Sequence, residues 1–234
     1  MVGEFSGGTM SSDGGGLLLR ETDSKRNLLA RFSQCFVDVR NPLQTAHSVE
    51  QMVRQRVYAL TLGYEDLKDH EQLRRDPLLG LMAGKPDPGA EPLAGKSTLN
   101  RMELGNGMPN RHKKINFWRD SVDDLLVAVF LEAHASAPEE IVLDIDTTDM
   151  ALHGKQEGRF YPGHYPHPCY LPLYIFCNDH VLCARLRPSN IGPAVGSKKE
   201  VARSVERIGL RWPEVRIILR GDSGFCVDEL NQLV

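Results

Sequence analysis

The chain has 234 residues, of which 41% are hydrophobic and 25% charged, with a formal net charge of −3. This composition is typical of a globular protein of one to two domains and excludes a collagen, a disulfide-dense miniprotein and a wholly disordered chain. No apolar run approaches the ~18–20 residues of a membrane helix, and residues 1–16 lack the pattern of a signal peptide. The five cysteines are odd in number and include no CxxC pair. We therefore expect a cytoplasmic protein with reduced thiols and no membrane partner.

The amino-terminal part of the chain predicts helices joined by turns. Residues 1–16 are rich in Gly and Ser and predict a flexible lead-in. Ser48 and Gln51 have the spacing of a capping box, and apolar residues then recur at helical spacing as far as Gly63. Residues 84–95 are rich in Pro and Gly and predict a long loop. Helices are expected within 17–40 and over 48–63, 65–75, 97–104 and 116–134.

From residue 140 onward the pattern changes to short strands. Ser197 and Glu200 have capping-box spacing at the start of a further helix, and another helix begins near Phe225. Strands are predicted at 140–147, 170–177, 181–186 and 215–219. The order β-β-β-α-β-α is that of a ribonuclease H-like fold, in which a right-handed crossover places the fourth strand beside the first. The sequence therefore predicts an α/β protein, with a helical amino-terminal region followed by a partial ribonuclease H-like mixed sheet.

Three aspartates stand where the predicted strands could bring them together. Asp144 and Asp146 lie two residues apart on the first strand, so they point to the same face of the sheet. Asp222 follows the fourth strand, at the end of a parallel strand where ligands collect in α/β sheets. Buried carboxylates need a partner, and oxygen ligands suit a hard divalent cation. The alternative for the pair on the first strand alone is an edge strand with one face in water.

Several motifs resemble those of DDE transposases from bacterial insertion sequences, specifically the type with a type 1 DDE domain. The amino-terminal half resembles the same family through its own segments, so that the resemblance covers nearly the whole chain. The motifs are LDIDTTD (143–149), HGKQEGRFY (153–161), YLPLYIF (170–176), LRPSN (186–190) and LRGDSGF (219–225). The segments are LLLRE (17–21), RQRVYALTLGYED (54–66), LRRDP (73–77) and STLNRME (97–103).

The resemblance implies a ribonuclease H-like catalytic core that uses Mg²⁺ to cleave and join the DNA ends of an insertion sequence. It assigns the first catalytic and metal-binding acid to Asp146, which precedes Thr147-Thr148 as in the family's D-x-T pattern, and the second to Asp222. Asp144 remains the alternative for the first position, because spacing alone does not separate the two.

The family's third acid is a Glu on a later helix, and Glu229 follows Asp222 too closely to be that residue. The chain ends at Val234, so we expect it to be the amino-terminal portion of a transposase and unable to transpose DNA alone. Two alternatives stay open. One is a catalytically inactive DNA-binding fragment of a transposase, and the other is a ribonuclease H-like metal nuclease.

The expected partner is double-stranded DNA, both the terminal inverted repeats of the transposon and the target. We expect the protein to be associated with the nucleoid when it is bound to DNA. A homo-oligomer on DNA is a further expectation. Residues 185–220 carry nine Lys or Arg and three Glu, a balance suited to phosphate contacts. We expect a lead-in at 1–16, a mainly helical DNA-contacting region at 17–137 and part of a DDE domain at 138–234. The predicted DNA-contacting residues are Asn100, Arg101, Arg111, Lys113, Lys114, Arg187, Lys198, Lys199 and Arg203.

Overall fold

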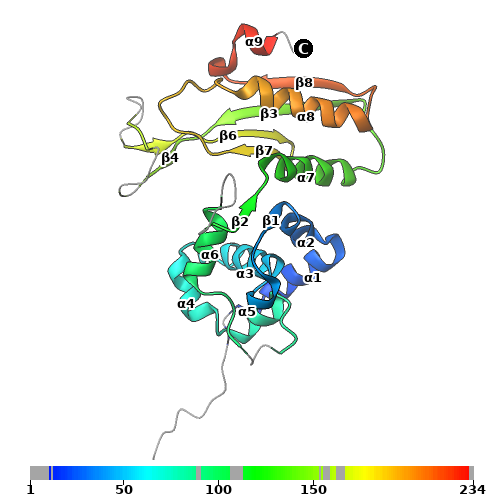
Figure 1. The fold of residues 1–234 in the computed structure, drawn as a ribbon. Coiled ribbons are helices and arrows are strands. Elements are labelled where there is room, and N and C mark those ends of the chain that lie inside the picture. The colour runs from blue at the N-terminus through cyan, green and yellow to red at the C-terminus, as the bar shows by residue number, and fades with distance from the viewer. Residues whose placement is uncertain are drawn as a thin grey trace, which may run out of the picture. The chain divides into compact units, whose positions relative to one another are not determined.

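The computed structural model describes residues 11, 13–87, 91–105, 113–152, 154, 159–161 and 167–231. The chain forms two compact units, residues 1–122 and 123–234 (Figure 1). Each unit has its own cluster of buried hydrophobic side chains. Within the described ranges, no helix is both long enough and apolar enough to cross a membrane.

The first unit is mainly helical. Its core is built from buried residues of α3, α5 and α6, among them Met52, Met82 and Leu99, each fully buried. Two short strands, β1 and β2, pair antiparallel beside these helices. The elements are α1 (Gly16–Arg26), α2 (Leu28–Ser33), β1 (Phe36–Asp38), η1 (Pro42–Gln44), α3 (Val49–Thr61), η2 (Leu67–Asp69), α4 (His70–Leu73), α5 (Pro77–Met82), α6 (Lys96–Glu103) and β2 (Ile115–Phe117).

The helix predicted at 48–63 is confirmed as α3, and its amino-terminal cap forms as the spacing indicates. Ser48 Oγ accepts a hydrogen bond from the Gln51 N–H at 3.1 Å. The helix predicted at 65–75 is interrupted, because η2 and α4 divide it into two short turns. A helix that the sequence did not predict, α5, starts at Pro77, where the Asp76 carboxylate accepts from the Leu79 N–H at 2.9 Å.

The second unit is a four-stranded mixed sheet covered by helices on one face. The strand order is β7-β6-β3-β8, with β3, β6 and β7 antiparallel and β8 parallel to β3, which confirms the predicted topology. The elements are α7 (Arg119–Glu132, from Asp123 onward in this unit), β3 (Glu140–Thr147), β4 (Met150–Ala151), β5 (Cys169–Tyr170), β6 (Leu173–Cys177), β7 (His180–Arg185), α8 (Ser197–Arg211), β8 (Arg216–Gly221), η3 (Ser223–Phe225) and α9 (Asp228–Asn231).

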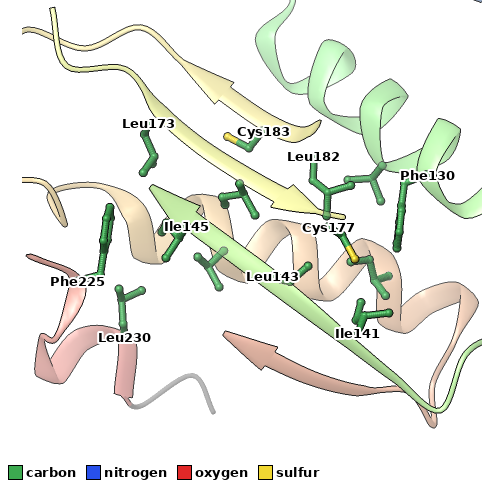
Figure 2. Packing of buried hydrophobic residues seen from close by; sticks show 14 of the residues in the cluster. Phe130, Ile141, Leu143, Ile145, Leu173, Cys177, Leu182, Cys183, Phe225 and Leu230 are labelled. Atoms are coloured by element: carbon green, nitrogen blue, oxygen red, sulfur yellow. The ribbon is translucent and has the colours of Figure 1, made fainter. Parts of the chain in front are cut away.

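Alternate residues of β3 form the centre of this unit's core. Ile141, Leu143 and Ile145 are at most 5% exposed and point to the face where α8 lies (Figure 2). Phe130 from α7 and Ile208 from α8 join them, and both side chains are fully buried. The other residues of β3, which alternate with these and include Asp144 and Asp146, therefore point to the opposite face.

The helix α8 starts where it was predicted, but the predicted capping box does not form. Gly196 precedes the helix in the left-handed region, with φ of 78°, and Ser197 is already helical. Ser197 Oγ donates to the carbonyl of Ala194 at 2.6 Å. The Glu200 side chain instead accepts from Arg185 Nε at 3.0 Å, so that it ties α8 to β7.

Candidate active site

The two aspartates that carry the predicted chemistry follow neighbouring residues of the parallel β3–β8 pair. Ile145 of β3 and Gly221, the last residue of β8, are register partners, so that Asp146 is the next residue of β3 and Asp222 directly follows β8. Neighbouring strands lie about 4.8 Å apart, so the backbones of the two aspartates lie at adjacent positions at the carboxyl end of the parallel pair. The structure thus brings together Asp146 and Asp222, which lie far apart in the chain.

Each of these carboxylates is oriented by a backbone N–H of its own segment. Asp146 Oδ1 accepts from the Thr147 N–H at 2.7 Å, and Asp222 Oδ1 accepts from the Gly224 N–H at 2.8 Å. Both aspartates are exposed, and within the part of the chain that the structure describes neither has a cationic side chain as a partner. The carboxylate charges therefore remain available to a ligand.

Asp144 lies in a different electrostatic environment. Its register partner on β8 is Arg220, whose guanidinium donates through Nη2 to Asp144 Oδ2 at 2.8 Å and through Nε to Oδ1. These hydrogen bonds hold the pKa of the Asp144 carboxyl below its usual range. The charge of Asp144 is already compensated by a cation, in contrast to Asp146. The sequence reasoning missed this ion pair, for which the only signal was the predicted parallel pairing of the two strands.

The turn that carries Asp222 is fixed by close packing. A Cβ at Gly221 would lie 2.8 Å from Ile145 Cγ2 and 3.1 Å from Phe225 Cβ, so only a residue without a side chain fits. Phe225 is 5% exposed and anchors the far side of the turn in the core. Beside Asp222, these residues border a hollow of about 190 Å³ that is otherwise lined by apolar side chains and Cys226.

The donor set of Asp146 and Asp222 fits a magnesium ion. Mg²⁺ prefers oxygen ligands, keeps several waters and is held by one or two carboxylates together with substrate phosphates. Asp146 and Asp222 supply two exposed carboxylates. No group of three or more His, Cys, Asp or Glu side chains that could hold a metal occurs in the described ranges.

The predicted DNA contacts of this unit fall into two kinds. Arg187 is 9% exposed and donates to the carbonyls of Leu171, Pro193 and Val195 at 2.7–3.1 Å, which commits it to the backbone of its own unit. This packing argues against the predicted contact of Arg187 with DNA.

Arg203 likewise lies in an ion cluster, where it binds Asp123 and Glu200. Lys198 is partly exposed and Lys199 exposed, both in the first turn of α8.

In the first unit, the predicted DNA contacts that the structure describes are exposed. Asn100 and Arg101 lie on α6, and Lys113 and Lys114 precede β2. Arg111 lies outside the described residues.

A family model described as transposase DDE domain group 1 matches residues 1–234. No curated protein and no solved structure matches the chain.

Proposed function

The chain belongs to the group 1 DDE transposases, and from this membership we propose that it takes part in metal-dependent cleavage and strand transfer of insertion-sequence DNA ends. The observation that carries the proposal is the register of β3 and β8, in which Asp146 and Asp222 follow the paired residues Ile145 and Gly221. Two acids from distant segments that meet at the same end of neighbouring strands can serve as protein ligands in two-metal phosphoryl transfer.

In this proposal Asp146 and Asp222 hold divalent magnesium through their carboxylate oxygens. When bound, such ions activate the attacking hydroxyl and stabilise the leaving oxygen at a phosphodiester. The Thr147 and Gly224 N–H groups keep the two carboxylates oriented before the ion arrives. Because Arg220 compensates the charge of Asp144, the proposal assigns the first acid to Asp146 rather than to Asp144.

We further propose that exposed basic and polar residues contact the DNA that the site acts on. Lys and Arg side chains bind phosphate oxygens and release condensed counterions, which makes the affinity depend on salt. The residues are Asn100, Arg101, Lys113 and Lys114 in the first unit and Lys198 and Lys199 in the second.

Metal binding tests the proposal most directly, because it does not depend on a third acid. We expect Mn²⁺ binding, followed by electron paramagnetic resonance, to weaken at least about tenfold in D146N and in D222N, since each loses a charged ligand. Asp179 is an exposed aspartate in the turn between β6 and β7, and D179N is the matched control with unchanged affinity.

A parallel assay with labelled terminal inverted repeats separates the alternatives. Mg²⁺-dependent nicking that is confined to the repeat and lost in D146N and D222N would show that this chain performs the transposase chemistry. Equal nicking of unrelated DNA would favour a general metal nuclease. Duplex binding without Mn²⁺ binding would favour a non-catalytic DNA-binding protein and would overturn the metal site.

A further inference from the structure

The first unit contains a polar hollow that the catalytic residues do not use. Its volume is about 420 Å³, within the range of small-molecule and nucleotide sites. Three separate segments meet there, namely the chain from β1 into η1, the helix α6 and the start of β2. The lining residues are Arg40, Asn41, Gln44, Thr45, Thr98, Arg101, Lys114 and Ile115.

The helix α6 turns two different faces to its surroundings. Leu99 and Met102 are at most 3% exposed and belong to the core of the first unit. Thr98 and Arg101, three residues apart and therefore on one face of the helix, line the hollow instead. Asn100 lies on neither face, because it is exposed and does not line the hollow. The core packing of α6 thus fixes where Arg101 is presented.

The lining has a positive charge that its own neighbours do not cancel. Arg40 is held in place by the Asp38 carboxylate, with Nη2 to Oδ2 at 2.7 Å, and by the carbonyl of His47 at 2.9 Å. Asp38 compensates the charge of Arg40. Arg101 and Lys114 are exposed, and neither forms an ion pair with any residue that the structure describes. Two cations without an ion pair among the described residues, a fixed guanidinium and the Thr98 hydroxyl therefore face one space, whereas the Thr45 hydroxyl already donates to the carbonyl of Asn41 at 2.8 Å.

We propose that this hollow binds a backbone phosphate of duplex DNA, with Arg101 and Lys114 as its two charged contacts. The inference rests on the proposed function and adds to it a DNA-positioning site remote in sequence from the aspartates. Guanidinium and ammonium groups form charge-assisted hydrogen bonds with phosphate oxygens, and hydroxyl and amide groups add further donors. A phosphate contact fixes the position of the duplex and reads no sequence.

The test measures binding of a fluorescent duplex to the full chain by anisotropy at several salt concentrations. We expect R101Q and K114Q each to weaken binding roughly tenfold at low salt and to lower the salt slope by about one. The loss should be the same for an inverted-repeat duplex and for an unrelated duplex. R101K should keep the salt slope, because it keeps the charge.

The matched control is R26Q, which removes an exposed cation from the last turn of α1, outside the hollow. Thermal unfolding of each variant confirms that the fold is intact. Equal affinities and slopes for R101Q, K114Q and R26Q would overturn the proposal.

The proposal would also be overturned if the mononucleotide dTMP raised the unfolding temperature of the wild-type chain while R101Q bound the duplex with unchanged affinity. That result would favour a small phosphorylated ligand. These variants should leave Mn²⁺ binding by Asp146 and Asp222 unchanged, so failure here is distinguishable from failure of the proposed function.

Discussion

Asp144 and Arg220 are register partners in the parallel pair of β3 and β8, and the guanidinium of Arg220 binds both carboxylate oxygens of Asp144. Asp146, two residues further along β3 on the same face, has no such cation among the described residues. The pair therefore distinguishes two aspartates that the sequence leaves equivalent, because only one of them retains a charge that is free to bind a metal ion.

This difference predicts opposite outcomes for the two asparagine variants. D144N should leave Mn²⁺ affinity within about twofold of wild type, whereas D146N should lower it at least about tenfold, since it removes an uncompensated ligand. Because Arg220 holds the pKa of Asp144 down, R220Q should raise that pKa, which an NMR pH titration measures. A large loss of metal in D144N with little change in D146N would make Asp144 the first acid.

Gly221 is predicted to be indispensable for the turn that carries Asp222. In G221A the new methyl group would meet Ile145 and Phe225 at 2.8–3.3 Å, so the turn must shift or the core must open. We expect a loss of about 1–3 kcal/mol in the free energy of unfolding and weaker Mn²⁺ binding. Urea unfolding measures the first effect. The matched control is G209A on α8, where a Cβ would meet nothing within 4 Å; equal losses in both variants would refute the steric argument.

The topology of the sheet could be predicted because local patterns and chain-handedness rules agree there. Apolar residues recur at every second position at 141, 143 and 145, and the observed strand covers the predicted residues 140–147. The right-handed crossover then requires a fourth strand parallel to the first, and β8 occupies that position. The proximity of Asp146 to Asp222 follows from that pairing.

Other features depend on partners that no local pattern identifies. The helix predicted over 116–134 starts only at Arg119, because residues 115–117 pair with β1, more than 70 residues earlier. Glu200 matches a capping box in sequence, yet it binds Arg185 of β7. The sequence does not reveal the structural role of Arg187 either, because its three hydrogen-bond acceptors are backbone carbonyls, which no side-chain pattern identifies.

Arg187 and the lysines of α8 are predicted to differ in what they contribute. R187Q removes the donors to three carbonyls and should lower the free energy of unfolding by roughly 2–4 kcal/mol. Neutralising the partly exposed Lys198 and the exposed Lys199 in the double variant K198Q/K199Q should leave stability unchanged and lower the salt slope of DNA binding by about two. Urea unfolding and anisotropy titrations measure the two effects. An unaltered slope in the double variant would remove these lysines from the DNA surface.

A buried ion cluster joins α7 and α8 to β7, and we predict that it stabilises the second unit. Asp123 of α7 is 3% exposed and binds both Arg185 and Arg203, which in turn bind Glu200 at 3.0 Å. D123A leaves two arginines with one carboxylate between them and should cost about 3–5 kcal/mol of stability. The neighbouring variant D124A breaks only a partly exposed pair with Arg207 and should cost less than about 1 kcal/mol. Equal costs in urea unfolding would contradict the burial argument.

The first unit should lose stability on mild acidification because it contains a buried neutral histidine. His70 is fully buried, and its Nδ1 lies 3.0 Å from Gln55 Nε2, which donates to it and also to the carbonyl of Ala94. Its Nε2 has no hydrogen-bond partner among the described residues. Burial, reinforced by the charge of Arg56, lowers the pKa of His70 from 6.5 to about 4. The folded state therefore resists the second proton.

Between pH 6.5 and about 4 the unfolded chain binds a proton at this site that the folded chain does not, so stability must fall as the pH falls through this window. The loss should be roughly 2–3 kcal/mol for this one group. In H70Q, which keeps an acceptor for Gln55 but cannot titrate, urea unfolding from pH 7 to 4 should show a pH dependence flatter by that amount. H47Q, which loses a partly exposed imidazole of the same unit, is the control with the wild-type dependence. Parallel curves for wild type and H70Q would show that the imidazole titrates alike in both states, and that its burial does not control the acid sensitivity of this unit.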